Sequence, residues 1–244
     1  MLEEAFNNYV SDYNLNNSDI KLKYNHSFRV MKLQEKYAKI LGWDKDDIEL
    51  ARIIGLLHDI GRFEQLRVYK TYDDSKSIDH ADYSCTQLFE KGEIKKFTLK
   101  EEWYPIIEFA IKNHNKKNLK KINDERTMMH AKLIRDTDKI DIIFLIGTLE
   151  ELRVSPVKAR ISKRVLDDFY NHNSISNILV KNRNDKYVSQ YAFAFDMNYD
   201  VCLRELRKNF INYAEKQKEN KQLMDVYEEM LKYIKERLEN GRVR

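Results

Sequence analysis

An adjacent histidine and aspartate end an apolar run in the stretch Leu56-Leu57-His58-Asp59-Ile60-Gly61-Arg62. The residues before this stretch predict a helix that begins at a good N-cap, Asp44, and repeats apolar side chains at helical spacing. His58 falls on the apolar face of that helix, and Gly61 is expected to end it. Two polar side chains are thus predicted in a buried place, where they cost free energy unless something pairs with them.

The preceding segment, residues 24–41, also predicts a helix with a histidine on its buried side. The repeating positions are spaced by three and four residues: His26, Val30, Leu33, Tyr37 and Ile40. The polar stretch from Arg62 to Ser77 has no sustained period and is interpreted as a loop.

Two further helices are predicted to bring histidines inward. Ser77 or Asp79 is expected to cap a helix that contains His80. The next helix begins near residue 101, tolerates a proline in its first turn, and carries His114 at helical spacing from apolar residues.

A fifth helix is expected from Glu125 to Leu152, and Asp138 occupies an apolar position on it. That is an unusual place for a carboxylate. Asp136 and Asp141 compete with it for any functional role, although Asp136 points about 200° round the helix.

The scarcity of glycine and proline, 6 and 2 in 244 residues, predicts an all-α fold, because hairpins and nucleotide-binding loops need these residues. We expect one helical domain in three segments: an N-terminal helix and loop over 1–23, a helical core over 24–152 that carries the inward-facing histidines, and C-terminal helices over 153–244 that pack on the same domain. In the last segment, one helix is predicted around Val165, followed by a polar break over 171–185 and two more helical stretches.

Composition limits the function classes. A net charge of +4 is nearly balanced, so nucleic-acid binding is not indicated. No apolar run approaches the ~20 residues of a transmembrane helix, and two distant cysteines suggest neither a disulfide framework nor a thiolate zinc site. We therefore expect a cytoplasmic protein that does not act at a membrane.

Four inward-facing histidines and an inward-facing aspartate predict a shared metal centre. Imidazole and carboxylate ligands without thiolates suit Fe, Mn, Co, Ni or Zn, whereas Ca or Mg sites are built from oxygen atoms. A catalytic site is therefore favoured over a structural zinc site.

The order His26, His58-Asp59 and Asp138 resembles the H…HD…D signature of the HD superfamily of metal-dependent phosphohydrolases. The resemblance covers roughly residues 20 to 150. It implies that these four residues hold one metal ion. Family members with two further histidines bind a second ion, with the aspartate of the doublet bridging, and His80 and His114 match that pattern in order.

The chemistry implied by the resemblance is hydrolysis of a phosphate ester or anhydride in a nucleotide or another small phosphorylated metabolite. Two ions clamp the phosphoryl oxygens and activate a bridging water as the attacking hydroxide. Asp59 is then also a catalytic residue. Arg62 and Lys139, which stand beside the motifs, are candidates to bind the phosphate, with surface salt bridges as the alternative.

Other functions remain open at this point. A di-iron oxygenase uses a similar ligand set within the same fold, and a non-catalytic nucleotide sensor retains only the fold. The cyclic-dinucleotide phosphodiesterase branch is disfavoured, because no Gly-Tyr-Pro motif follows His114. Glu64 and His130 are weaker candidates for supporting roles, and the lysine run over 112–121 is either an attracting surface or a solvated loop.

Overall fold

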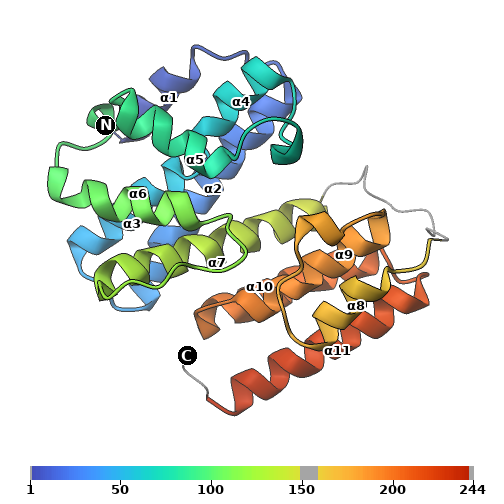
Figure 1. Cartoon of the computed structure of the whole chain (residues 1–244). Coiled ribbons are helices and arrows are strands. Elements are labelled where there is room, and N and C mark those ends of the chain that lie inside the picture. The colour runs from blue at the N-terminus through green and yellow to red at the C-terminus, as the bar shows by residue number, and fades with distance from the viewer. Residues whose placement is uncertain (1, 149–158, 242–244) are drawn as a thin grey trace. The chain divides into compact units, whose positions relative to one another are not determined.

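The computed structural model describes residues 2–148 and 159–241, and within these ranges the chain consists of helices and loops without a strand (Figure 1). The α-helices are α1 Leu2–Val10, α2 Ser18–Ile40, α3 Lys45–Leu57, α4 Gly61–Tyr69, α5 His80–Cys85, α6 Tyr104–Asn113, α7 Glu125–Thr148, α8 Lys163–Tyr170, α9 Arg183–Tyr191, α10 Asp200–Glu215 and α11 Lys221–Glu239. The predicted all-α class is confirmed. None of the described helices combines the length and the apolarity that crossing a bilayer requires.

Two compact units make up the chain, Met1–Thr137 and Asp138–Arg244. The division falls inside helix α7. The three predicted segments, with boundaries at residues 23 and 152, stay a prediction. Residues 149–152, where α7 was expected to end, lie outside the described residues.

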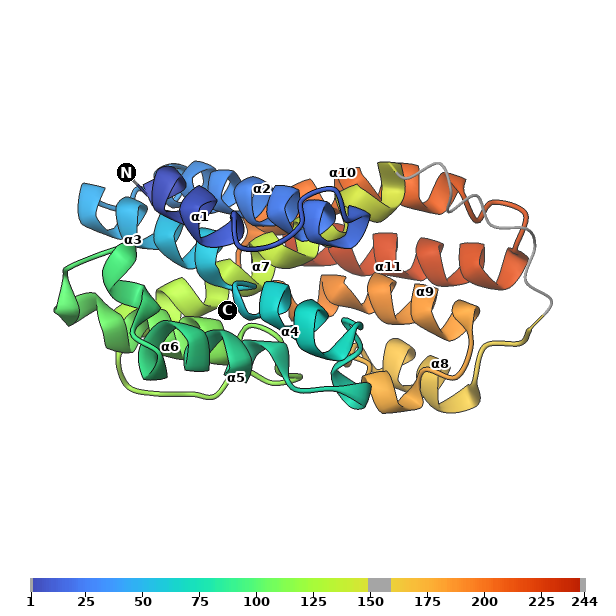
Figure 2. The same ribbon diagram turned by 90° about the horizontal axis from the view of Figure 1, so that it is seen from above.

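Helices α2 and α3 lie side by side in the first unit (Figure 2). Their approach depends on Gly55, because a Cβ atom there would stand 2.7 Å from the side chain of Gln34 and 2.9 Å from the backbone of Met31. The predicted helix over 24–41 is confirmed with His26 buried, but Ile40 at its last turn is 55% exposed. Close packing of these two helices brings His26 to the end of α3.

The predicted loop after the doublet is wrong in its first half, because residues 61–69 form helix α4. Gly61 begins this helix rather than ending α3. A Cβ atom at Gly61 would stand 2.6 Å from the backbone nitrogen of Ser84, so glycine is needed for α4 to approach α5. The pattern was obscured because Glu64 and Gln65 are buried together with the apolar residues of α4.

The next two helices begin as the sequence predicted. The Asp79 side chain accepts hydrogen bonds from the backbone of Ala81 and Asp82 and caps α5. A short 3-10 turn, Glu101–Trp103, leads into α6, and Pro105 stands in the first turn of that helix. Both helices pack within the first unit, and α5 contacts α4 as well as α6.

The second unit is built from α8 to α11 and the end of α7. Val165 and Phe169 of α8 are buried, as predicted, and so are Leu223, Met230 and Ile234 of α11. The polar break is shorter than expected, since α9 begins at Arg183, and three helices follow it rather than two. Most side chains of α9 are buried, including polar ones, which hides its helical period.

Candidate metal centre

Four imidazole rings and one carboxylate meet in the interior of the first unit. His26, His58, Asp59, His80 and His114 are at most 7% exposed. Neighbouring ring centroids are 5.1 Å apart for His26–His58 and His58–His114, and 5.0 Å apart for His80–His114. The four sequence-predicted histidines therefore form one cluster with Asp59.

Two of the rings are oriented by the ends of their own helices. His58 follows the last residue of α3 and His114 follows the last residue of α6. Each donates its Nδ1 proton to a carbonyl three residues earlier, His58 to Gly55 at 2.8 Å and His114 to Ile111 at 2.7 Å. Since a carbonyl oxygen only accepts, this bond places the proton of a neutral ring on Nδ1, so Nε2 is the nitrogen that could bind a metal ion.

His80 is oriented by a carboxylate instead. It is the first residue of α5, and its Nδ1 donates to Asp74 Oδ2 at 2.5 Å. The other oxygen of Asp74 accepts hydrogen bonds from Arg62 at 2.8 Å and from Gln65 at 3.0 Å. A carboxylate that holds the outer nitrogen of a histidine is the usual support of a metal-ligating ring.

The two oxygens of Asp59 face different pairs of histidines. Oδ2 lies 3.6 Å from Nε2 of His26 and 3.7 Å from Nε2 of His58. Oδ1 lies 3.5 Å from Nε2 of His80 and 3.8 Å from Nε2 of His114. The donor atoms of each trio, Asp59 with either pair, all lie within 4.8 Å of one another.

The donor atoms fit divalent metal ions. The Nε2 atoms are 3.2 Å apart in the first pair and 3.1 Å apart in the second. Two ligands ~2.1 Å from one ion at angles of ~90° to ~109° are themselves ~3.0 to ~3.4 Å apart. In the second pair each Nδ1 already donates to an oxygen, so the two Nε2 atoms face each other across a gap that a proton or a metal ion can bridge.

Asp59 itself adds two observations. Among the described residues, its buried Oδ1 has no hydrogen-bond partner, which leaves a full lone pair for a ligand. Burial acts to raise the pKa of Asp59, but the nearby cations, first among them Lys23, outweigh it and hold that pKa well below its usual range. The carboxylate is therefore ionised, which is the form that binds metal.

Asp138, the remaining predicted ligand, is partly buried on α7. It directly follows Thr137, whose hydroxyl oxygen accepts a hydrogen bond from Gln34 Nε2 at 2.8 Å. Asp136 and Asp141, its competitors in the sequence, are both buried. The ligand role of Asp138 stays a prediction.

The two predicted phosphate-binding cations have carboxylate partners. Arg62 donates through one nitrogen to Gln65, to the carbonyl of Tyr72 and to Asp74, at 2.7 to 2.8 Å. Lys139 forms an ion pair with Asp196 at 2.8 Å within the second unit. These contacts give both side chains an anchoring role, and their direct contact with a substrate stays a prediction.

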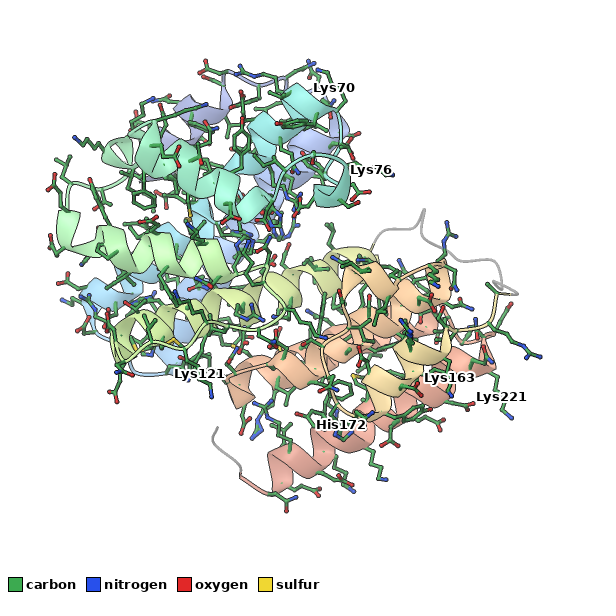
Figure 3. The ribbon with its side chains drawn as sticks, in the orientation of Figure 1. Lys70, Lys76, Lys121, Lys163, His172 and Lys221 are labelled. Atoms are coloured by element: carbon green, nitrogen blue, oxygen red, sulfur yellow. The ribbon has the colours of Figure 1, made fainter. Side chains whose placement is uncertain are left out.

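The other candidates lie in different surroundings. His130 is fully buried, and its Nε2 is 3.0 Å from Asp47 Oδ1. His172, a residue of the second unit labelled in Figure 3, packs against the rings of Phe195 and Tyr233 at tilted angles. Lys121, also labelled there, is the exposed end of the lysine run. None of these residues shares a metal-binding group with the doublet among the described residues.

Glu64 is likewise engaged. It is 7% exposed and forms an ion pair with Arg67 at 2.7 Å, and Tyr13 donates a hydrogen bond to it at 3.3 Å. These contacts make Glu64 a structural element of α4.

Sequence reasoning missed three supporting residues. Lys23 donates to Asp59 Oδ2 at 2.6 Å, and its place one helical turn before His26 was the available signal. Asp74 belongs to a short 3-10 turn, Asp74–Lys76, where no periodic pattern exists. Arg135 of α7 donates to the carbonyls of Asn113, His114 and Lys116 and so fixes the end of α6.

Residues 24–143 match the family model described as the HD domain. The matched range contains the doublet, the four clustered histidines and Asp138. No curated protein and no solved structure matches the chain. The motif order, the convergence of its side chains and the family match together identify residues 24–143 as an HD domain.

Proposed function

We propose that the protein is a phosphohydrolase with two divalent metal ions that share Asp59 as a bridging ligand. One ion would be held by His26, His58 and Asp59 Oδ2, and the other by His80, His114 and Asp59 Oδ1. The substrate would be a nucleotide or another small phosphorylated metabolite. Fe, Mn, Co, Ni and Zn are all compatible with this ligand set.

The observation that carries the proposal is that the two oxygens of Asp59 face different pairs of histidines. Its two oxygens each stand 3.5 to 3.8 Å from two imidazole nitrogens, and each pair of nitrogens is separated by a distance that one ion can span. A single ion cannot use all of these donors, because the two trios face opposite oxygens of one carboxylate. Two ions that share Asp59 can use them all.

Asp138 completes the ligand set of the first ion in this proposal. Its support is the motif order together with the continuity of α7, which runs through residue 138 without interruption. The neighbouring residue Thr137 accepts a hydrogen bond from Gln34 of α2.

When bound, the two ions supply Lewis-acid polarisation of the phosphoryl oxygens and activation of a water molecule. The chain's own residues prepare the site for this chemistry. Asp59 stays ionised, Asp74 and two backbone carbonyls fix three imidazoles in the tautomer that exposes Nε2, and apolar side chains around the cluster exclude bulk water. No side-chain nucleophile is required.

A cytoplasmic location is part of the proposal. Cys85 and Cys202 are both buried and form no disulfide within the described residues. Reduced thiols are usual in the cytoplasm.

The test is release of inorganic phosphate or nucleotide by metal-reconstituted protein from a panel of phosphate esters, nucleotides and dinucleoside polyphosphates. Asp59→Ala serves as the matched control, and circular dichroism checks its helical fold. We expect turnover in the wild type and none in the variant. Oxygen uptake with ferrous ion and no phosphate release would replace the proposal with an oxygenase, and ligand binding without either reaction would replace it with a sensor.

A further inference from the structure

Lys23 places a positive charge at the edge of the metal centre. It stands one turn before His26 on α2, and its Nζ lies 2.6 Å from Asp59 Oδ2. The side chain is 17% exposed, so it reaches from the cluster toward solvent. Its ammonium group is also 5.8 Å from the ring centroid of Tyr72.

The ring of Tyr72 keeps this lysine in place. The Tyr72 hydroxyl donates to the backbone carbonyl of Asp19, one turn before Lys23, and so ties the ring to the start of α2. Arg62 lies 5.6 Å from the centroid of the same ring. The aromatic ring thus neighbours two cations, and it favours an ammonium group that stays at the centre over one that extends into solvent.

The three candidate cations differ in their partners. Arg62 is held by Asp74 and by two other oxygen acceptors, and its Nε also lies 3.6 Å from Asp59 Oδ1, whereas Lys139 pairs with Asp196 in the second unit. Lys23 has one ionic partner among the described residues, Asp59. That partner is the carboxylate that the proposed metal ions would share.

Metal binding at Asp59 would therefore weaken the ion pair between Asp59 and Lys23. The negative charge of one carboxylate cannot fully balance two divalent ions and an ammonium group together. A largely buried ammonium group with a weakened partner is costly, and a new anion at the same place removes the cost. The phosphoryl group of a substrate at the two ions is such an anion.

We propose that Lys23 is a substrate-binding residue that donates a hydrogen bond to a non-bridging oxygen of the phosphoryl group. This inference rests on the proposed phosphohydrolase function. It assigns the direct phosphate contact to Lys23, while Arg62 acts through Asp74 to orient His80. Neither role follows from the doublet motif.

The experiment measures binding of inorganic phosphate to the metal-loaded protein by isothermal titration calorimetry, with metal content determined on the same samples. The variants are Lys23→Met, which removes the charge and keeps the length of the side chain, and Lys23→Arg, which keeps the charge. Lys21→Met is the matched control, because Lys21 is an exposed lysine on the same helix.

We expect Lys23→Met to keep the wild-type metal content and to bind phosphate about tenfold more weakly, the scale of one lost charge-assisted hydrogen bond. Lys23→Arg should recover most of the affinity, and Lys21→Met should match the wild type. In turnover with a phosphorylated substrate, Lys23→Met should raise KM more than it lowers kcat.

Two results would overturn the inference. Equal phosphate affinity of Lys23→Met and the wild type would remove Lys23 from the substrate site. Loss of metal from Lys23→Met would show that the lysine positions Asp59 instead. Failure of the proposed function looks different, because the metal-loaded wild type would then neither bind phosphate nor hydrolyse any ester or anhydride.

Discussion

Replacing Asp74 with asparagine tests how the second pair of histidines is prepared for metal. The carboxylate accepts the Nδ1 proton of His80 at 2.5 Å and also holds Arg62 at 2.8 Å. Asp74→Asn keeps the shape of the side chain and removes the charge. A charge-assisted hydrogen bond is worth about 1.5–3 kcal/mol and a neutral one about 0.5–1.5 kcal/mol. The expected loss is therefore about 1.4 kcal/mol, or about tenfold in metal affinity.

The assay is metal titration against a chromophoric chelator, which resolves two binding steps. Asp74→Asn should weaken the step that belongs to His80 and His114 and leave the other step unchanged. Asp73→Asn is the matched control, since Asp73 is the neighbouring carboxylate and its side chain contacts Ser75 and Lys76 among the described residues, away from the histidines. If Asp74→Asn left both steps at their wild-type affinities, or weakened both equally, the orienting role of Asp74 would be refuted.

Three further predictions concern the scaffold around the centre. Gly61→Ala should lower the free energy of unfolding by about 1–3 kcal/mol in urea titrations, because the added Cβ would meet the backbone of α5. The control Gly147→Ala, where the added Cβ would have no neighbour closer than 3.5 Å, should stay within about 1 kcal/mol of the wild type. Equal effects of the two substitutions would contradict the packing argument. Arg135→Met should remove the hydrogen bonds to the carbonyls at the end of α6, lower Tm and weaken the metal-binding step of His80 and His114. An unchanged metal titration would show that Arg135 is not needed to position His114. Burial lowers the pKa of His130, and the nearby Asp47 opposes this shift. The unfolded chain therefore takes up this proton first as the pH falls through about 6.5, and the free energy of unfolding decreases. His130→Gln should show a smaller decrease in the free energy of unfolding between about pH 7.5 and about pH 5.5, and equal decreases in both proteins would contradict the burial argument.

The sequence was informative wherever a helix has one apolar face and a clear cap. Asp44 and Asp79 cap the helices that were expected to begin there, and His26 lies on the buried side of its helix. The HD doublet carried the functional prediction, because a histidine and an aspartate at the end of an apolar run need a partner. These features are local, so they can be read from spacing alone.

The sequence was uninformative where polar side chains are buried or where helices distant in sequence approach closely. Glu64 and Gln65 are buried and hydrogen-bonded, so polar residues stand on the inner face of α4 and the apolar period that would have predicted this helix is missing. Gly61 was interpreted as a helix stop, although its small size serves the contact with α5. The link between Asp74 and His80 arises from a loop without a repeating pattern, so only the folded chain reveals it.

The central claim is that Asp59 joins two metal ions, and metal content per chain tests it most directly. The protein is purified without chelators or a nickel column and analysed by elemental analysis beside His80→Ala and Asp59→Ala, with circular dichroism to verify the folds. The account predicts about two ions in the wild type, about one in His80→Ala and about none in Asp59→Ala. A single ion in both the wild type and His80→Ala, or two ions retained by Asp59→Ala, would contradict it.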